Sequence, residues 1–398
     1  MGELSCDVLV AGGGLVGATA ALALSRAGLS VVLVDRTEPP ISRGGLGFDA
    51  RTVALNPASV ELLTELDVWR SFAPCPFESV YVCEERGTRH IEFHAAEVER
   101  HELGWIVEVS PSVGALWAAL KRQHNLTIVS GNIENVTATA EAVRLQAGDA
   151  QLTARLLIAA DGANSSIRTQ LGVDASRFET HQAAIATVVE TQLAHGGTAW
   201  QCFMRDGPLA LLPLPTRDGR NFCSVVWSQS EATAAQLMEL DDAHFVARLD
   251  LATDARLGAI RAVDKRFSFP LEQLVAGSFL PAPRVLLIGD AARVLHPLAG
   301  QGVNLGFEDL NEVLRVARRV GPADLGDPQL WQGFARRRRL RAELMVRAMD
   351  AFAMVYRISD PGLSWLRNVA VDLLNAAPPL KRQLIREALG FGVFAPPR

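Results

Sequence analysis

The chain has 398 residues, of which 49% are hydrophobic and 21% are charged, and its formal net charge is −5. This length exceeds what one hydrophobic core usually takes, so we expect two interleaved or consecutive domains. The composition excludes long disordered stretches, and no apolar run approaches the roughly 20 residues that cross a bilayer. The five cysteines form no CxxC pair and no metal-ligand spacing, which predicts reduced thiols and no metal site.

The N-terminal segment has the pattern of a βαβ unit. The pattern runs through an apolar strand at 6–12, a glycine turn at 13–17, a helix rich in Ala and Leu at 18–29, and a second strand at 30–36. No basic region and no small-residue cleavage site precede the first strand, which leads us to expect a cytoplasmic protein.

The turn of this unit fits the pattern G-x-G-x-x-G at Gly12, Gly14 and Gly17. Glycines in that pattern permit a tight turn, close backbone approach to a pyrophosphate and close helix packing. Asp35 ends the next strand, where it can accept hydrogen bonds from ribose hydroxyls, and we include the adjacent Arg36 among the cofactor-binding candidates. The pattern favours a dinucleotide over a purely structural turn, but it does not separate FAD from NAD.

Further elements follow in chain order. Strand signals lie at 126–129, 156–160 and 284–288, and the last two strands end in the acidic turns Asp161-Gly162 and Gly289-Asp290. Between them, residues 177–269 alternate apolar and polar side chains over short spans, which predicts an antiparallel sheet in a second domain. After residue 308 the pattern becomes helical.

Two later segments decide between the dinucleotides. Residues 289–306 read GDAARVLHPLAGQGVNLG, and residues 161–168 read DGANSSIR. With the glycine turn, they resemble the single-component FAD-dependent aromatic hydroxylases, whose fold is like that of p-hydroxybenzoate hydroxylase. Through residues 47–55, 207–214 and 379–382 the chain resembles the ubiquinone-biosynthesis hydroxylases more closely, almost from end to end.

The resemblance implies an α/β fold in which a Rossmann-like FAD-binding domain carries an inserted antiparallel-sheet substrate domain and a C-terminal helical segment. The expected FAD-binding parts are residues 1–75, 97–176 and 270–325, the substrate-domain parts are 76–96 and 177–269, and the helical region is 326–398.

The resemblance also implies roles for particular residues. Asp290 would meet the ribityl or pyrophosphate region of FAD, Arg51 would reach towards the flavin, and Asp161-Gly162 would serve both FAD and the nicotinamide cofactor. A further turn would present backbone N–H groups to the isoalloxazine ring, through Gly300, Gln301, Gly302, Val303 and Asn304. His296 and Pro297 would lie by the reactive flavin face, with His296 as a proton relay.

Simpler interpretations stand beside these roles. The glycines could form a surface loop, Arg51 a surface salt bridge, and His296 a packed histidine without catalytic function. The chain departs from the family pattern at Arg293, where histidine is frequent, and at Val303, where a larger residue often stands; both changes could alter the pocket without removing the flavin.

In function, the resemblance implies a monooxygenase that uses FAD, NAD(P)H and O₂ to hydroxylate an aromatic ring, most closely a polyprenylated, lipid-like phenol. Its substrate pocket would be lined by residues 199–214. The alternatives are a hydroxylase of the same fold that acts on a soluble aromatic compound, and a flavin-binding scaffold subunit of a biosynthetic complex. NAD(P)H oxidation under air separates an enzyme from a scaffold.

The C-terminal part differs in charge from the rest. From residue 331 onward, 12 Lys and Arg accompany 5 Asp and Glu, and Arg336 to Arg339 with Arg341 form a cationic run. This run, with the apolar residues after it, suggests peripheral contact with the inner membrane or a ubiquinone complex. The alternative is that the arginines form solvated faces or domain-docking ion pairs. Nucleic acid is excluded, because the chain is acidic overall and the run lacks interleaved aromatic residues.

Overall fold

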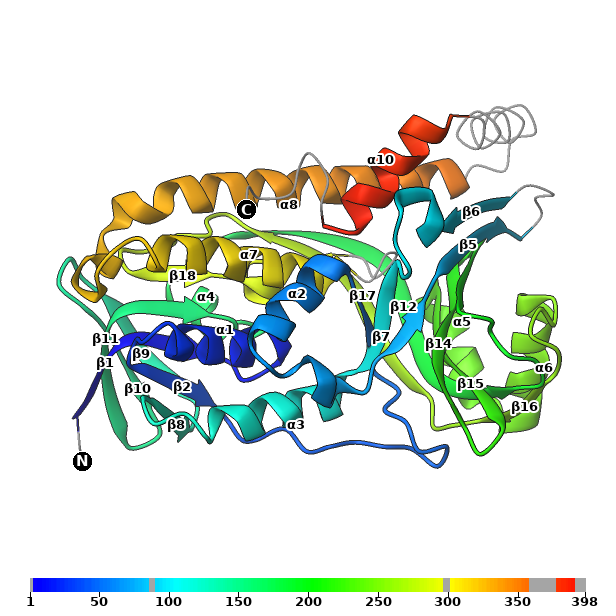
Figure 1. The fold of residues 1–398 in the computed structure, drawn as a ribbon, viewed down its shortest axis with the longest axis horizontal. Coiled ribbons are helices and arrows are strands. Elements are labelled where there is room, and N and C mark those ends of the chain that lie inside the picture. The colour runs from blue at the N-terminus through cyan, green and yellow to red at the C-terminus, as the bar shows by residue number, and fades with distance from the viewer. Residues whose placement is uncertain (1–2, 86–89, 296–300, 358–376, 391–398) are drawn as a thin grey trace.

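The structure, a computed structural model, describes residues 3–85, 90–295, 301–357 and 377–390. Figure 1 shows two sheet regions side by side, with helices α1, α3 and α7 around one and helices α5 and α6 at the far end of the other. A long helix, α8, runs along the molecule above α7. The predicted α/β fold class is confirmed, whereas the domain boundaries stay a prediction.

The first sheet has seven strands in the order β8-β2-β1-β11-β10-β9, and β18 pairs with β11. Its strands are β1 (Glu3–Ala11), β2 (Val31–Asp35), β8 (Leu126–Ser130), β9 (Ile133–Ala138), β10 (Val143–Ala147), β11 (Ala150–Ala159) and β18 (Val285–Leu287). β8, β2, β1, β11 and β18 pair in parallel. Their carboxyl ends therefore meet at one edge, which brings together the turns that follow them.

Helices cover this sheet closely. They are α1 (Leu15–Arg26), α2 (Pro57–Glu65), α3 (Val109–Leu120), the short α4 (Ser166–Gln170) and α7 (Gln301–Ala317). Gly28 follows the C-cap residue Ala27 of α1 with φ +88°, and its N–H donates to Ser25 O at 3.0 Å, as glycine does where a helix ends. In β2 the first four residues are buried, as expected for a strand covered on both faces.

The second sheet has nine strands in the order β19-β17-β12-β15-β14-β13-β5-β6, and β16 pairs with β12. Its strands are β5 (Ser79–Glu84), β6 (His90–His94), β12 (Ala175–Thr191), β13 (Thr198–Met204), β14 (Gly207–Arg217), β15 (Arg220–Ser230), β16 (Ile260–Val263), β17 (Phe267–Ala276) and β19 (Arg293–Val294). All its pairs are antiparallel except β5 with β13. One face is covered by α5 (Glu231–Glu239) and α6 (Asp242–Thr253).

A small third sheet lies between the two, in the order β3-β7-β4. The remaining short elements are β3 (Thr52–Leu55), β4 (Cys75–Phe77), β7 (Gly104–Glu108), η1 (Trp69–Phe72), η2 (Ala95–Val98), η3 (Gly289–Ala291) and η5 (Pro322–Gly326). On the second sheet's other face, Phe222 and Leu214 pack with Phe48, Phe77 and Ile106 in a buried apolar cluster. This inner cluster joins the second sheet to the third.

The C-terminal helices are α8 (Pro328–Arg357) and α10 (Pro378–Ala388). Four arginines of the cationic run bind carboxylates: Arg338 pairs with Glu308 and Asp309, Arg341 with Glu308, Arg337 with Glu312, and Arg339 with Glu343. The first three of these arginines dock α8 on α7, so for them the domain-docking interpretation is correct. Among the described residues, no helix combines the length and apolar character needed to cross a membrane.

Candidate cofactor site

The predicted glycine turn lies between β1 and α1. Gly12 has φ +96°, and a β-carbon there would stand 2.3 Å from Ala160 O. A β-carbon on Gly17 would stand 1.9 Å from Gly12 O, so both positions require glycine. A β-carbon on Gly14 would meet nothing within 4 Å. The turn is thus tight against the protein and open at the N-terminus of α1, where unpaired N–H groups suit a pyrophosphate.

Asp35 lies at this turn, as its position at the end of β2 predicts. Its Oδ2 accepts a hydrogen bond from Gly13 N, and its Oδ1 accepts one from Arg36 N at 2.6 Å. Gly13 O in turn accepts from Trp117 Nε1 at 2.8 Å. Each carboxylate oxygen can accept further hydrogen bonds, so Asp35 is held in place and still able to bind ribose hydroxyls. The Arg36 side chain is exposed.

Asp161-Gly162 follows β11 at the same edge. Asp161 Oδ2 accepts from Ile167 N at 3.2 Å and from Ser166 Oγ at 3.3 Å. Asp161 Oδ1 is buried and has no hydrogen-bond partner among the described residues. Gly162 has φ +85° and open space where a β-carbon would stand. A buried acceptor without a partner is costly, so a donor from a bound group fits this position.

Gly289-Asp290 follows β18 and lies beside the glycine turn. A β-carbon on Gly306 of α7 would stand 2.6 Å from Val16 of α1. The helix that follows the Gly289-Asp290 turn therefore lies close against the helix that follows the glycine turn. Asp290 keeps solvent-exposed surface, yet neighbouring protein desolvates its carboxyl and raises its pKa, while Arg293 opposes the shift. A carboxyl held in this way accepts hydroxyl groups readily and disfavours bare negative charge.

The N-terminus of α7 belongs to the predicted flavin-binding segment. Three predicted residues of this segment lie outside the described residues: His296, Pro297 and Gly300. The helix begins at Gln301, so the N–H groups of Gln301, Gly302 and Val303 have no partner within the helix. A β-carbon on Gly302 would stand 3.8 Å from Asp290 Oδ1, which places this first turn next to Asp290.

The side chain of Asn304 has a structural role that the sequence does not indicate. Its Oδ1 accepts from Asn56 N at 3.0 Å and from Ser59 Oγ at 2.7 Å, and its Nδ2 donates to Ala54 O at 2.8 Å. Asn304 is buried, so these bonds tie the first turn of α7 to β3 and α2. Its expected backbone contact with a flavin ring stays a prediction.

Arg51 precedes β3 and is held through its backbone. Arg51 N donates to Asp49 Oδ1 at 2.9 Å, and Asp49 Oδ2 accepts from Ser110 N at 2.8 Å. Glu108 Oε2 accepts from Asp49 N at 2.6 Å. The Arg51 side chain is 61% exposed, and its Nε lies 3.8 Å from Asp49 Oδ1. A weak surface ion pair of this kind leaves the guanidinium able to reach a ligand.

Arg168 connects two of the cofactor segments, although the sequence marked only the run in which it stands. Its Nη1 donates to Ala291 O at 2.9 Å and its Nη2 to Ala163 O at 2.6 Å. Arg168 is buried, and burial lowers the pKa of its guanidinium. One side chain therefore binds the turn after β11 to the turn after β18.

Arg293 belongs to a buried ion network that sequence reasoning missed. Its Nη1 lies 2.5 Å from Asp309 Oδ2, which also accepts from Gly289 N at 3.0 Å. Arg338 Nε donates to Asp309 Oδ1, and Arg338 Nη1 lies 2.9 Å from Glu308. Burial lowers the pKa of Arg293, and Asp309 opposes that shift. The network ties the Gly289 turn to α7 and α8.

The expected substrate-pocket segment, residues 199–214, divides between the two faces of the second sheet. Ala199 and Leu214 belong to the inner cluster, whereas Trp200 and Cys202 line a cavity on the face that α5 and α6 cover. Successive strand residues point to opposite faces, so the segment cannot line one pocket along its whole length. Which of these two faces receives the substrate stays a prediction.

Comparisons of sequence give the family. A family model described as an FAD binding domain matches residues 5–348. The chain is 33% identical to the 3-demethoxyubiquinol 3-hydroxylase of Escherichia coli (strain K12), over 96% of this chain and 98% of that protein. It is 32% identical to ubiquinone hydroxylase UbiL of Rhodospirillum rubrum, over 96% of this chain and 89% of that protein.

Solved structures agree on the fold. The p-nitrophenol 4-monooxygenase PnpA from Pseudomonas putida DLL-E4 has a TM-score of 0.78 at 19% identity, over 99% of this chain and 100% of that one. Klebsiella pneumoniae HpxO, solved with FAD and uric acid, has a TM-score of 0.71 at 16% identity, over 99% and 97%. The enzyme is an FAD-dependent oxidoreductase with NAD(P)H as reductant, and the chain belongs to the ubiquinone-biosynthesis hydroxylases of the FAD-dependent monooxygenases.

Proposed function

We propose that this enzyme hydroxylates the aromatic ring of a polyprenylated phenol during ubiquinone biosynthesis, with NAD(P)H and O₂ as co-substrates. The observation that carries the proposal is the similarity to two hydroxylases named for ubiquinone or its demethoxy precursor, each over 96% of this chain. Because that similarity covers both large sheets, it includes the side of the molecule that would receive the substrate as well as the cofactor edge.

In this proposal, residues at the edge of the first sheet each hold a different part of FAD. The N–H groups at the starts of α1 and α7 bind the pyrophosphate and the flavin ring, and Asp35 accepts ribose hydroxyls. Asp161 and Asp290 accept hydroxyl or ring N–H donors, and Arg51 approaches from β3. Bound FAD supplies hydride acceptance from NAD(P)H and the single-electron chemistry with which O₂ reacts.

The inner cluster provides the apolar wall for the ring. Phe48 and Phe222 lie 5.0 Å apart between ring centroids, and both are buried. An apolar wall at this place would keep water away from bound FAD during its reaction with O₂. His296 and Pro297, outside the described residues, complete the proposal as the groups at the reactive face, with His296 as the proton relay.

The experiment uses the purified, FAD-loaded enzyme under air. We expect NADH or NADPH oxidation to be stimulated by a short-chain polyprenyl phenol, and one oxygen atom from isotopically labelled O₂ to appear on the ring. Faster coupled turnover of a soluble phenol, such as 4-hydroxybenzoate, would contradict the lipid-like substrate. A flavin that neither reductant reduces, with any of these phenols, would contradict an enzyme and favour the scaffold. Quinone intermediates in a deletion strain would identify the ring carbon.

We further propose that the enzyme meets its lipid-like substrate by peripheral contact with the membrane through leucines of α8 rather than through the arginine run. Leu340 and Leu344 are 56% and 47% exposed and lie one turn apart, whereas the neighbouring arginines are committed to carboxylates. Replacing both leucines by Glu should reduce flotation with anionic liposomes, with Leu251→Glu on α6 as the exposed control. No flotation of the unchanged protein would overturn the contact.

A further inference from the structure

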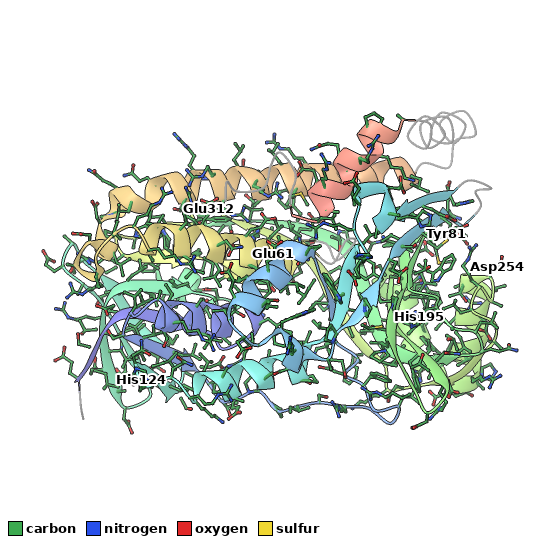
Figure 2. All side chains as sticks on the ribbon, viewed as in Figure 1. Glu61, Tyr81, His124, His195, Asp254 and Glu312 are labelled. Carbon is green, nitrogen blue, oxygen red and sulfur yellow. The ribbon has the colours of Figure 1, made fainter. Side chains whose placement is uncertain are left out.

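A cavity of about 540 Å³ lies away from the cofactor residues, on the face of the second sheet that α5 and α6 cover. Its walls include Tyr81, Trp200, Trp227, Leu237, Arg248 and Arg256. Figure 2 shows Tyr81 and Asp254, which both border it, at the end of the molecule that carries α6. No residue assigned above to FAD lines this cavity. The cavity is therefore separate from the cofactor site.

Two cysteines stand side by side in the cavity wall. β5 and β13 pair in parallel, and their register places Cys83 directly opposite Cys202. Side chains at paired positions point to the same face, and neighbouring strands lie about 4.8 Å apart. Disulfides join residues whose α-carbons are about 4.4–6.8 Å apart, so the strand spacing permits a bond without backbone movement. Both cysteines are free thiols, half-buried, and line the cavity.

The environment shifts the pKa values of the two thiols in opposite directions. A hydrogen bond from Cys202 lowers the pKa of Cys83, and the Arg256 guanidinium lowers it further against desolvation and Asp254. The same hydrogen bond, with burial, raises the pKa of Cys202. Arg256 is held over the rings of Tyr81 and Trp200, at 4.5 and 5.0 Å from their centroids. Cys83 thus has the lower pKa of the pair and is the thiol that ionises first, with Cys202 as its proton-bearing neighbour.

The other three cysteines provide an internal contrast. Burial raises the pKa of Cys6 to about 12, that of Cys75 to about 11 and that of Cys223 to about 12. All three are buried among core residues. A buried neutral thiol is a poor nucleophile, so oxidants in solution should reach and react with the cavity pair first.

We propose that Cys83 and Cys202 form a peroxide-reactive dithiol, a site of reversible oxidation separate from the flavin. The Cys83 thiolate attacks one oxygen of hydrogen peroxide; the O–O bond breaks, giving a sulfenic acid at Cys83 and hydroxide, which becomes water by taking up the proton that the Cys83 thiol released when it ionised. Cys202 sulfur then attacks the sulfenic sulfur, the S–O bond breaks, and the departing hydroxyl leaves with the Cys202 proton as water. Two thiols and one peroxide thus yield one disulfide and two waters.

The position of the bond gives it a structural effect. β5 and β6 form the edge of the second sheet, and β13 is the strand that joins them to it. A disulfide between residues 83 and 202 would attach this edge covalently across a long chain separation. Constraining so long a loop in the unfolded chain stabilises the folded one, so oxidation should raise the thermal midpoint.

The test treats the FAD-loaded enzyme with hydrogen peroxide and maps its thiols by mass spectrometry without reductant. We expect a Cys83–Cys202 linked peptide while Cys6, Cys75 and Cys223 remain reduced, and full reversal by dithiothreitol. Loss of thiols without that linked peptide overturns the proposal. So does oxidation of the three buried cysteines as fast as the pair, and this comparison needs no variant.

Variants then separate the two roles. In Cys202→Ser, dimedone should trap a lasting sulfenic acid at Cys83, whereas in Cys83→Ser the Cys202 thiol should stay reduced. Arg256→Gln should slow oxidation by about tenfold, because it removes the cation that favours the thiolate. Cys75→Ala is the matched control and should form the disulfide at the original rate. Equal rates in Arg256→Gln and the unchanged enzyme would overturn the assignment of Cys83 as the activated thiol.

Discussion

Two segments meet at the cofactor edge, and they are held there by different physical means. In the first, a β-carbon on Gly12 or Gly17 would collide with backbone oxygen at 2.3 or 1.9 Å, so steric exclusion sets the shape. In the second, Asp309 binds Gly289 N and the Arg293 and Arg338 guanidinium groups inside the protein. The first turn keeps its shape because glycine has no β-carbon, and the second keeps its shape because buried charged groups bind one another.

The difference teaches where support for the flavin site lies. Steric exclusion is local. Gly12 and Gly17 follow β1, and the backbone oxygens they approach belong to Gly12 itself and to Ala160, which follows the adjacent parallel strand β11. A buried ion network is stable only when every partner is present, because desolvation of each charge must be offset. Arg338 comes from α8, so this C-terminal helix is part of the support of the second cofactor segment rather than a separate charged tail.

The largest expected effect follows from removing the central charge of the network. Asp309→Asn keeps the side-chain size but leaves Arg293 and Arg338 in the core with one carboxylate fewer. Breaking a buried ion pair costs about 3–5 kcal/mol, so we expect a loss of that size in the free energy of unfolding. Urea denaturation measures it, and FAD retention on gel filtration should fall with it because the Gly289 turn loosens.

Glu343→Gln is the matched control, since it also removes one carboxylate that binds an arginine of the run. The Arg339–Glu343 pair is exposed and lies on one helix, and such pairs contribute about 0.3–0.5 kcal/mol. Equal losses in the two variants would mean that the network does not hold the second segment.

The contrast between the segments also explains what the sequence could predict. The glycine turn, the place of Asp35 and the buried strand β2 follow from local patterns, and the structure has them as expected. Asp309 and Arg338 stand 29 residues apart on two helices, and no local pattern joins them. The sequence therefore left the arginine run open between membrane contact, a solvated face and domain-docking ion pairs, because sequence shows charge but not which carboxylates face it.

The second expected effect tests the steric half of the comparison. Gly17→Ala places a β-carbon 1.9 Å from Gly12 O, which the backbone can relieve only by moving the turn. Overpacking of this kind costs about 1–3 kcal/mol. We expect thermal unfolding at a lower temperature and at least a tenfold weaker FAD affinity, measured by flavin fluorescence.

Gly14→Ala separates packing from binding. Its β-carbon would meet nothing within 4 Å and its φ of −71° suits alanine, so the stability of the FAD-free protein should not change. FAD affinity should still fall, because the added methyl group occupies space at the N-terminus of α1 where the phosphates bind. Unchanged affinity in this variant would place the pyrophosphate elsewhere.

The smallest expected effect concerns Asp290, where desolvation and a nearby cation oppose each other. The folded carboxyl has a raised pKa, so it binds its proton more tightly than in the unfolded chain, where the pKa is about 3.9. Its contribution to stability is therefore complete at low pH and is lost as pH rises from the unfolded value through the folded one. Asp290→Asn carries no such charge, so the FAD-free variant should gain stability relative to the unchanged protein as pH rises from about 4, and the difference should level off once the pH has passed the folded pKa. Urea unfolding of both proteins across that range measures the difference. A constant difference, or one that shrinks with pH, would mean that Arg293 outweighs burial at this position and that the second segment favours the ionised carboxylate.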